Sequence, residues 1–129
     1  MKKVGVITWH YLENYGSALQ AYAMQRNIEK LGYIVEFINY RRNANTNFIY
    51  KALRFIKYHM YYPKNSLRRR AKVFQQFRRK YLKESLLYVN NDELIKMANN
   101  YDIYVCGSDQ IWSPNRLELP YLLGFVTNN

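Results

Sequence analysis

The residues best suited to chemistry in this 129-residue chain lie in two polar segments, each of which follows an apolar run. The first segment carries an imidazole, an amide and a helix start: His10, Asn14, Tyr15, Gly16 and Ser17. A histidine can act as a general acid or base, and free amides at a helix N-terminus suit a carboxylate or a phosphate. The same residues can also form an ordinary turn and cap, with the imidazole as a neutral hydrogen-bonding contact.

The second polar segment is the run 107–112, Gly-Ser-Asp-Gln-Ile-Trp. Its glycine permits a sharp turn, its polar side chains can bind sugar hydroxyls, and its indole offers a stacking face. The candidate binding residues are Ser108, Asp109, Gln110 and Trp112. The nucleophile elbow that would expose a catalytic serine is missing, so we do not expect a Ser-His-Asp triad.

Several common chemistries are disfavoured by the residues present. The three glycines of a dinucleotide fingerprint and the Gly-Lys-Ser/Thr ending of a Walker loop are both absent around Gly16. The single cysteine, Cys106, excludes an internal disulfide and a cysteine-cluster metal site, and no His/carboxylate cluster has metal-ligand spacing. We therefore expect no metal, no cofactor, a buried Cys106 and a reducing, cytoplasmic compartment.

A β-α-β pattern can position the first segment. The continuous apolar run 4–9 is typical of a strand buried on both faces of a parallel sheet, and 33–38 is again strand-like. Apolar residues at helical spacing predict a helix over 17–31 between them, with Ser17 as a possible cap and Gly32 as its end. The fold class expected is therefore α/β.

A third buried strand is expected at 101–106, after a short helix over 92–99. Ligands of open parallel sheets bind beyond the carboxyl ends of the strands. We therefore expect three polar segments, 10–16, 39–42 and 107–112, to converge at that edge.

The positive charge is concentrated in one part of the chain. The net charge is +11, yet 14 of the 20 basic residues and no acidic residue lie between Arg41 and Lys83. This basic insert, residues 41–83, reads as two amphipathic helices with apolar positions Ile49, Leu53, Ile56 and Met60, then Leu67, Ala71, Phe74 and Tyr81. It could be a solvated helical hairpin or could lie on an anionic membrane surface; nucleic-acid binding is the least favoured reading.

Length and hydropathy limit the organisation further. Residues 1–129 suffice for one domain, and no stretch approaches the ~20 apolar residues that span a bilayer. A cytoplasmic location is expected, with peripheral contact at the inner face of the membrane left open.

The chain also carries a set of motifs: Thr8, His10, Asn14-Tyr15-Gly16-Ser17, Leu19-Gln20-Ala21-Tyr22-Ala23, Leu31-Gly32-Tyr33, Ile38-Asn39-Tyr40-Arg41, Gly107-Ser108-Asp109-Gln110-Ile111-Trp112 and Tyr121-Leu122-Leu123-Gly124-Phe125-Val126. In combination they resemble the N-terminal half of the polysaccharide pyruvyl transferase family. The resemblance runs nearly end to end.

The resemblance implies transfer of a pyruvyl group from phosphoenolpyruvate to a sugar hydroxyl pair, giving a ketal on a cell-surface polysaccharide. It implies a Rossmann-like half of a GT-B-like two-domain architecture, with substrate contacts from residues 14–17, Ser108, Asp109, Gln110 and Trp112. His10 is the candidate catalytic residue.

The resemblance implies that the family's second half binds phosphoenolpyruvate, and that half has no counterpart in this sequence. The chain is therefore expected to be a truncated half-domain, inactive unless a second half-domain chain completes it. The alternative is a non-catalytic sugar- or anion-binding module that uses its basic helical pair at a membrane surface.

Overall fold

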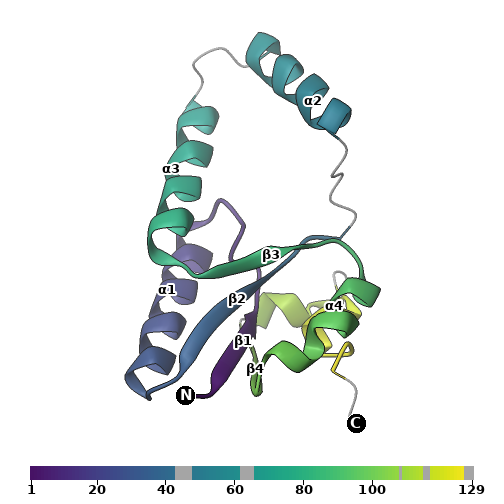
Figure 1. Ribbon diagram of the computed structural model, residues 1–129. Coiled ribbons are helices and arrows are strands. Elements are labelled where there is room, and N and C mark those ends of the chain that lie inside the picture. Colours follow the sequence, from purple (N-terminus) through teal and green to yellow (C-terminus); the bar gives the residue numbers. More distant parts are fainter. Residues whose placement is uncertain (43–47, 62–65, 108, 115–116, 127–129) are drawn as a thin grey trace.

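The fold is built on a sheet of parallel strands. A computed structural model describes residues 1–42, 48–61, 66–107, 109–114 and 117–126. Within these ranges the sheet has four strands in the order β3-β2-β1-β4 (Figure 1). The strands are β1 (Lys3–Ile7), β2 (Ile34–Tyr40), β3 (Glu84–Tyr88) and β4 (Ile103–Cys106), and every pairing is parallel. The expected α/β class with a parallel sheet is confirmed.

Strand β1 occupies the centre because its residues have no polar face to expose. Val4 pairs with Val35 of β2 on one side and with Ile103 of β4 on the other. Val4, Val6 and Ile7 are buried, as expected for a strand covered on both faces. The order of strands matches the first four of a doubly wound sheet, in which β2 and β3 are added on one side of β1 and β4 is added on the other.

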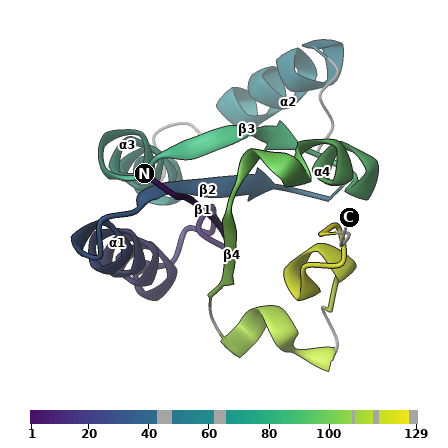
Figure 2. The same ribbon diagram turned by 60° about the horizontal axis from the view of Figure 1, so that its bottom comes forward.

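Helices cover both faces of the sheet (Figure 2). Helices α1 (Tyr15–Lys30) and α3 (Ser66–Tyr81) lie on one face, and α4 (Asn91–Met97) lies on the other. Two hydrophobic clusters match these layers. One joins α1 to the sheet: Val4, Val6, Ala21, Val35, Phe37 and Leu82. The other joins α4 and the C-terminal segment to the sheet, with Ile7, Ile38, Leu94, Ile111, Tyr121 and Phe125 among its members.

Helix α1 begins two residues before the predicted start. The side-chain oxygen of Asn14 accepts from the amides of Gly16 (2.7 Å) and Ser17 (3.4 Å), so Asn14 caps the helix and the expected Ser17 cap is wrong. The end of the helix is as predicted. Gly32 follows it with φ of +85°, a left-handed conformation that glycine adopts without steric cost.

Strand β3 is the main departure from the sequence expectations, which contained three strands. It lies at an edge of the sheet and none of its residues is fully buried; Leu86, for example, is 81% exposed. A search for continuous apolar runs detects strands covered on both faces, and β3 is not one of them. The helix predicted at 92–99 is present as α4 and a following 3₁₀ turn, Ala98–Asn100.

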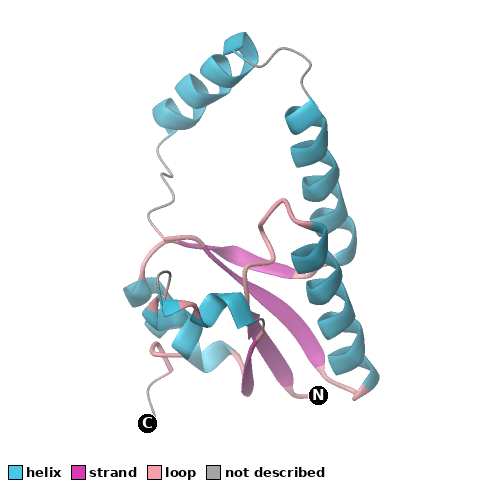
Figure 3. Cartoon of the chain, turned by 180° about the vertical axis from the view of Figure 1, so that it is seen from behind, coloured by secondary structure: helices cyan, strands magenta, loops and turns pink. Residues whose placement is uncertain are grey.

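Helix α3 packs on α1 mainly through aromatic rings. Phe74 lies 4.9 Å from Tyr15 between ring centroids, and Tyr22 lies 6.1 Å from Phe77 and 5.8 Å from Tyr81. Helix α2 (Phe48–Tyr61) is instead set apart from the sheet (Figures 1 and 3). No helix in the described ranges is long and apolar enough to cross a membrane.

The centre of the sheet gives a first prediction. A Cβ atom on Gly5 would lie 2.9 Å from the Tyr101 ring and 3.1 Å from Ile38, closer than carbon atoms normally pack. We expect Gly5→Ala to lower the free energy of unfolding by about 1–3 kcal/mol in denaturant titrations, despite the smaller unfolded-state entropy of alanine. A loss below about 0.5 kcal/mol would show that β1 tolerates a side chain there.

Candidate functional site

The polar segments that follow β1, β2 and β4 meet at the carboxyl edge of the sheet. The amide of Gly107 donates to the Ile7 carbonyl (3.2 Å), so the segment after β4 starts beside the end of β1. From the other side, the Arg41 guanidinium lies over the Tyr11 ring, 5.0 Å from its centroid. The predicted convergence is thus present in the described residues. It lies at the switch point, where doubly wound sheets bind ligands.

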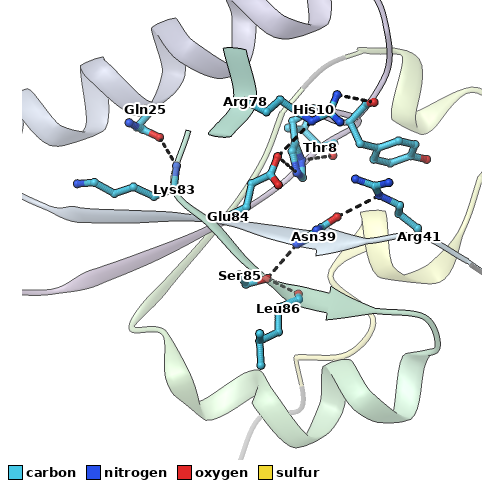
Figure 4. Close-up of polar contacts among 11 residues, drawn as sticks. Thr8, His10, Gln25, Asn39, Arg41, Arg78, Lys83, Glu84, Ser85 and Leu86 are labelled. Carbon is cyan, nitrogen blue, oxygen red and sulfur yellow. Dashed lines mark hydrogen bonds and ion pairs between the residues drawn. The ribbon is translucent and has the colours of Figure 1, made fainter. Parts of the chain in front are cut away.

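The His10 side chain points toward Glu84 and lies next to Arg78 instead of facing solvent (Figure 4). Its side chain is fully buried and its ring lies 5.2 Å from that of Phe37. The Nδ1 atom lies 3.1 Å from the carbonyl oxygen of Thr8. Because a carbonyl oxygen only accepts, Nδ1 carries a proton, and in the neutral ring Nε2 presents its lone pair.

That lone pair faces a carboxylate. Nε2 of His10 lies 3.4 Å from Oε1 of Glu84, and neither atom has a hydrogen-bond partner among the described residues. The Nε of Arg78 lies 3.5 Å from the same Oε1, and its Nη1 donates to the Tyr11 carbonyl (3.1 Å). The result is a compact cluster of one imidazole, one carboxylate and one guanidinium that ties segment 8–11 to α3 and β3.

Burial is the largest influence on the charge of this histidine. It lowers the pKa of His10 to about 4, and the positive charges of Arg41 and Arg78 act in the same direction, against the hydrogen bond to the Thr8 carbonyl. The imidazole is therefore neutral at pH 7. Chemically, the pair formed by Nε2 and Glu84 Oε1 is one proton short and can accept a proton or a hydrogen-bond donor.

The helix start differs from the expected anion site. The amides of Gly16 and Ser17 are bonded to the Asn14 side chain, and the amide of Ala18 donates to the Asn14 carbonyl (3.0 Å). The alternative of an ordinary turn and cap at Asn14, Gly16 and Ser17 is therefore confirmed, and the expectation of free amides is wrong, because the cap satisfies them. Tyr15 is 68% exposed beside Phe74 and remains available to a ligand at this edge.

The segment after β4 is described only in part. Ser108 lies outside the described residues, as do the side chains of Asp109 and Gln110, so their predicted substrate contacts stay predictions. Residues 109–112 form a 3₁₀ turn where the sequence indicated a loop. The turn is anchored by the buried Ile111, and Trp112 Nε1 donates to the Tyr121 carbonyl (3.2 Å) while the side chain stays half-exposed.

Cys106 is held in the same region. Its Sγ lies 3.2 Å from the Tyr121 carbonyl oxygen, and the residue is half-buried where full burial was expected. Burial raises the pKa of the thiol, which keeps it protonated and poorly nucleophilic at neutral pH. In the described part of the chain, no three His, Cys, Asp or Glu residues are grouped so that they could hold a metal ion.

Glu84 and Arg78 were not among the residues singled out from the sequence. One signal in the sequence could have indicated Glu84. It is the first acidic residue after the basic, acid-free stretch 41–83, which makes it a candidate ion-pair partner for those basic residues. Its contact with His10 could not be read from spacing, since 74 positions separate the two in the chain. The contact depends on the pairing of β3 with β2.

The strand order and the polar segments at the switch point define an α/β protein of the doubly wound class, with its candidate site at the carboxyl edge. The family model of polysaccharide pyruvyl transferase matches residues 14–128, and the chain belongs to this family. The resemblance carried by the motifs is thereby confirmed. Comparisons with curated proteins and with solved structures gave no match.

The cap of α1 can be tested by stability. We expect Asn14→Ala to lower the free energy of unfolding by about 1 kcal/mol, because two amides lose their acceptor. Asn14→Asp should retain most of the stability, since a carboxylate accepts the same bonds and suits the helix N-terminus. Asn27→Ala, in the interior of α1, is the matched control and should be neutral or slightly stabilising. Equal effects at the two positions would contradict the capping role.

The buried imidazole predicts a pH-dependent stability. The folded chain disfavours protonation of His10, whose pKa falls from 6.5 to about 4, so the unfolded chain binds more protons between these values. Stability from this group is complete above about pH 6.5 and is lost as the pH falls toward 4, by about 3 kcal/mol in total.

Carboxylates also titrate in this window, so the measurement is the difference between wild type and His10→Gln. Denaturant titrations at a series of pH values should give a flatter profile for the variant between pH 6.5 and 4. Parallel profiles would show that His10 is not held neutral by burial.

Proposed function

We propose that this chain provides one side of the active-site cleft of a pyruvyl transferase that uses phosphoenolpyruvate and a sugar of a cell-surface polysaccharide. The observation that carries the proposal is the family match over residues 14–128. It is supported by the convergence of segments 8–16 and 107–112 at the switch point of the sheet.

The proposed reaction balances without an oxidant or a reductant. One sugar hydroxyl adds across the C2–C3 double bond of phosphoenolpyruvate, forming a C–O bond at C2 while a proton goes to C3 and creates the methyl group. The second hydroxyl oxygen then replaces phosphate at C2, and its proton is lost to solvent or to the departing phosphate. The catalyst must therefore orient two sugar hydroxyls, deliver a proton to carbon and bind an anionic donor.

The residues of this chain suit the sugar side of that task. Tyr15 and Trp112 are exposed aromatic side chains that can pack on a sugar ring, and Asp109 and Gln110 have the polar groups that sugar hydroxyls prefer. His10 is enclosed, so we assign it to positioning: its bond to the Thr8 carbonyl and its packing on the Phe37 ring hold the segment that leads to Tyr15.

The donor side requires residues from elsewhere. We propose that a second Rossmann-like half-domain faces this edge, as in a GT-B architecture, and supplies the cationic groups for phosphoenolpyruvate. The chain by itself should then bind without turnover. Its alternative function is that of a non-catalytic sugar- or anion-binding module.

The assay combines phosphoenolpyruvate with an acceptor polysaccharide, following phosphate release and ketal formation by mass spectrometry. We expect no product from this chain alone. In a full-length member of the family, assayed with its own acceptor, substitutions matching Asp109→Ala and Gln110→Ala should each lower kcat/KM by about 10-fold to 100-fold, through lost hydrogen bonds to the sugar.

The matched control in the full-length enzyme is the substitution corresponding to Leu86→Gln, at the exposed edge strand, which should leave kcat/KM unchanged. Unchanged activity in both site variants would overturn the assignment of the segment after β4. Ketal formation by this chain alone would overturn the need for a second half. Loss of activity in the full-length enzyme without any effect on sugar binding by this chain would argue against the binding-module alternative.

A further inference from the structure

Helix α2 presents a continuous apolar stripe to its surroundings. Leu53, Ile56 and Met60 follow one another at intervals of three and four residues, so they share one face of the helix. Each of these side chains is more than half exposed, and Met60 reaches 73%. We call these three residues the α2 stripe. A stripe of this length is normally covered in a folded protein.

Helix α3 has the same amphipathic pattern as α2, but its apolar face is covered. Phe74 is buried against Tyr15, and Phe77 and Tyr81 pack on Tyr22. Helix α3 is therefore part of the layer that covers the sheet. The α2 stripe is the amphipathic surface that remains available for a partner outside the described residues.

The charges of α2 indicate the chemistry of that partner. The helix has three basic residues and no acidic one in its sequence, Lys51, Arg54 and Lys57, and Lys57 is exposed. No acidic residue lies between positions 41 and 83. A helix that is apolar along one face and whose charged residues are all basic is complementary to an anionic lipid bilayer, in which headgroups attract the cations and acyl chains accept the stripe.

The alternative occupants fit these observations less well. A second copy would cover the stripe but would bring together two chains of net charge +11 through their most basic regions. A nucleic acid would neutralise the cations but leave the apolar stripe in water. An anionic bilayer satisfies both properties at once.

We propose that α2 is a membrane-docking helix, which lies in the plane of an anionic bilayer with the α2 stripe inserted among the lipids. This inference goes beyond the proposed function, because it requires neither phosphoenolpyruvate nor a second half-domain. Helix α2 follows the carboxyl end of β2 along the chain and lies beyond that edge of the sheet (Figures 1 and 3). Docking through α2 would therefore hold the candidate site near the membrane surface.

The experiment measures sedimentation of the full chain with vesicles of phosphatidylcholine containing phosphatidylglycerol, compared with pure phosphatidylcholine. We expect binding to the anionic vesicles only, weakening with added salt. The double variant Leu53→Gln/Ile56→Gln keeps good helix formers in α2 but removes two of the three residues of the stripe, and should bind the anionic vesicles at least about tenfold more weakly. Lys57→Glu should also weaken binding and reduce its salt dependence.

The matched control is Leu31→Gln/Leu86→Gln, which removes two apolar side chains outside α2 that are more exposed than Leu53 and Ile56, and it should bind like the wild type. Circular dichroism and denaturant titrations establish that each variant is folded. Equal binding of the wild type to neutral and anionic vesicles, or no binding to either, would overturn the proposal. So would unchanged binding of the α2 variant, or a dimer in solution that dissociates in that variant, which would assign the stripe to a second copy.

Discussion

The pairing of β1 with a parallel strand on each side is the constraint on which the rest of the structure depends. A strand with apolar side chains on both faces is stable only if its backbone is hydrogen bonded at both edges and helices cover both faces. With β2 and β4 in place, the segments that leave β1 and β4 start next to each other. The candidate site is thus a consequence of how the core is completed.

Two buried polar side chains, Gln25 and His10, connect the central strands and α1 to the outer elements α3 and β3. Gln25 of α1 donates to the Tyr81 carbonyl (3.0 Å) and accepts from the Lys83 amide (3.1 Å), so it joins the end of α3 and the start of β3 to α1. The next residue, Glu84, then faces His10. The cluster of titratable groups beneath the edge is therefore set by a backbone connection that Gln25 holds in register.

The elements that could be predicted from the sequence are those whose own residues determine them. The continuous apolar run of β1 and the glycine after α1 indicate a buried strand and a helix end wherever the rest of the chain lies. The run at 101–106 correctly indicates the strand β4, but its expected burial is wrong, because β4 lies at an edge of the sheet and its residues are only half-buried. Edge strand β3 has no such signature, since its stability comes from the hydrogen bonds of β2. The choice of Asn14 over Ser17 as cap depends on a local competition between two suitable residues, which the sequence pattern leaves open.

The candidate site can likewise be divided into features that local sequence indicates and features that depend on long-range pairing. Motifs indicated the segments around His10 and Trp112, because short-range features such as strand ends, glycines and aromatic residues mark loops at a sheet edge. The burial of His10 and its contact with Glu84 are long-range consequences of β3 pairing. Of the two roles that the sequence left open for His10, the structure favours the neutral hydrogen-bonding contact, in an enclosed site whose neighbours come from α3 and β3.

The helices α2 and α3 show what amphipathic periodicity can and cannot predict. A repeat of three and four residues shows that a helix has an apolar face, but only the neighbouring elements determine whether that face is covered. For α3, two tyrosines of α1 provide the cover, and basic residues such as Arg69, Lys72 and Arg79 are left exposed, while Arg78 is enclosed beside Glu84. For α2, no element described here contributes a comparable set of rings. The same pattern therefore builds a structural layer in α3 and leaves an exposed apolar face on α2.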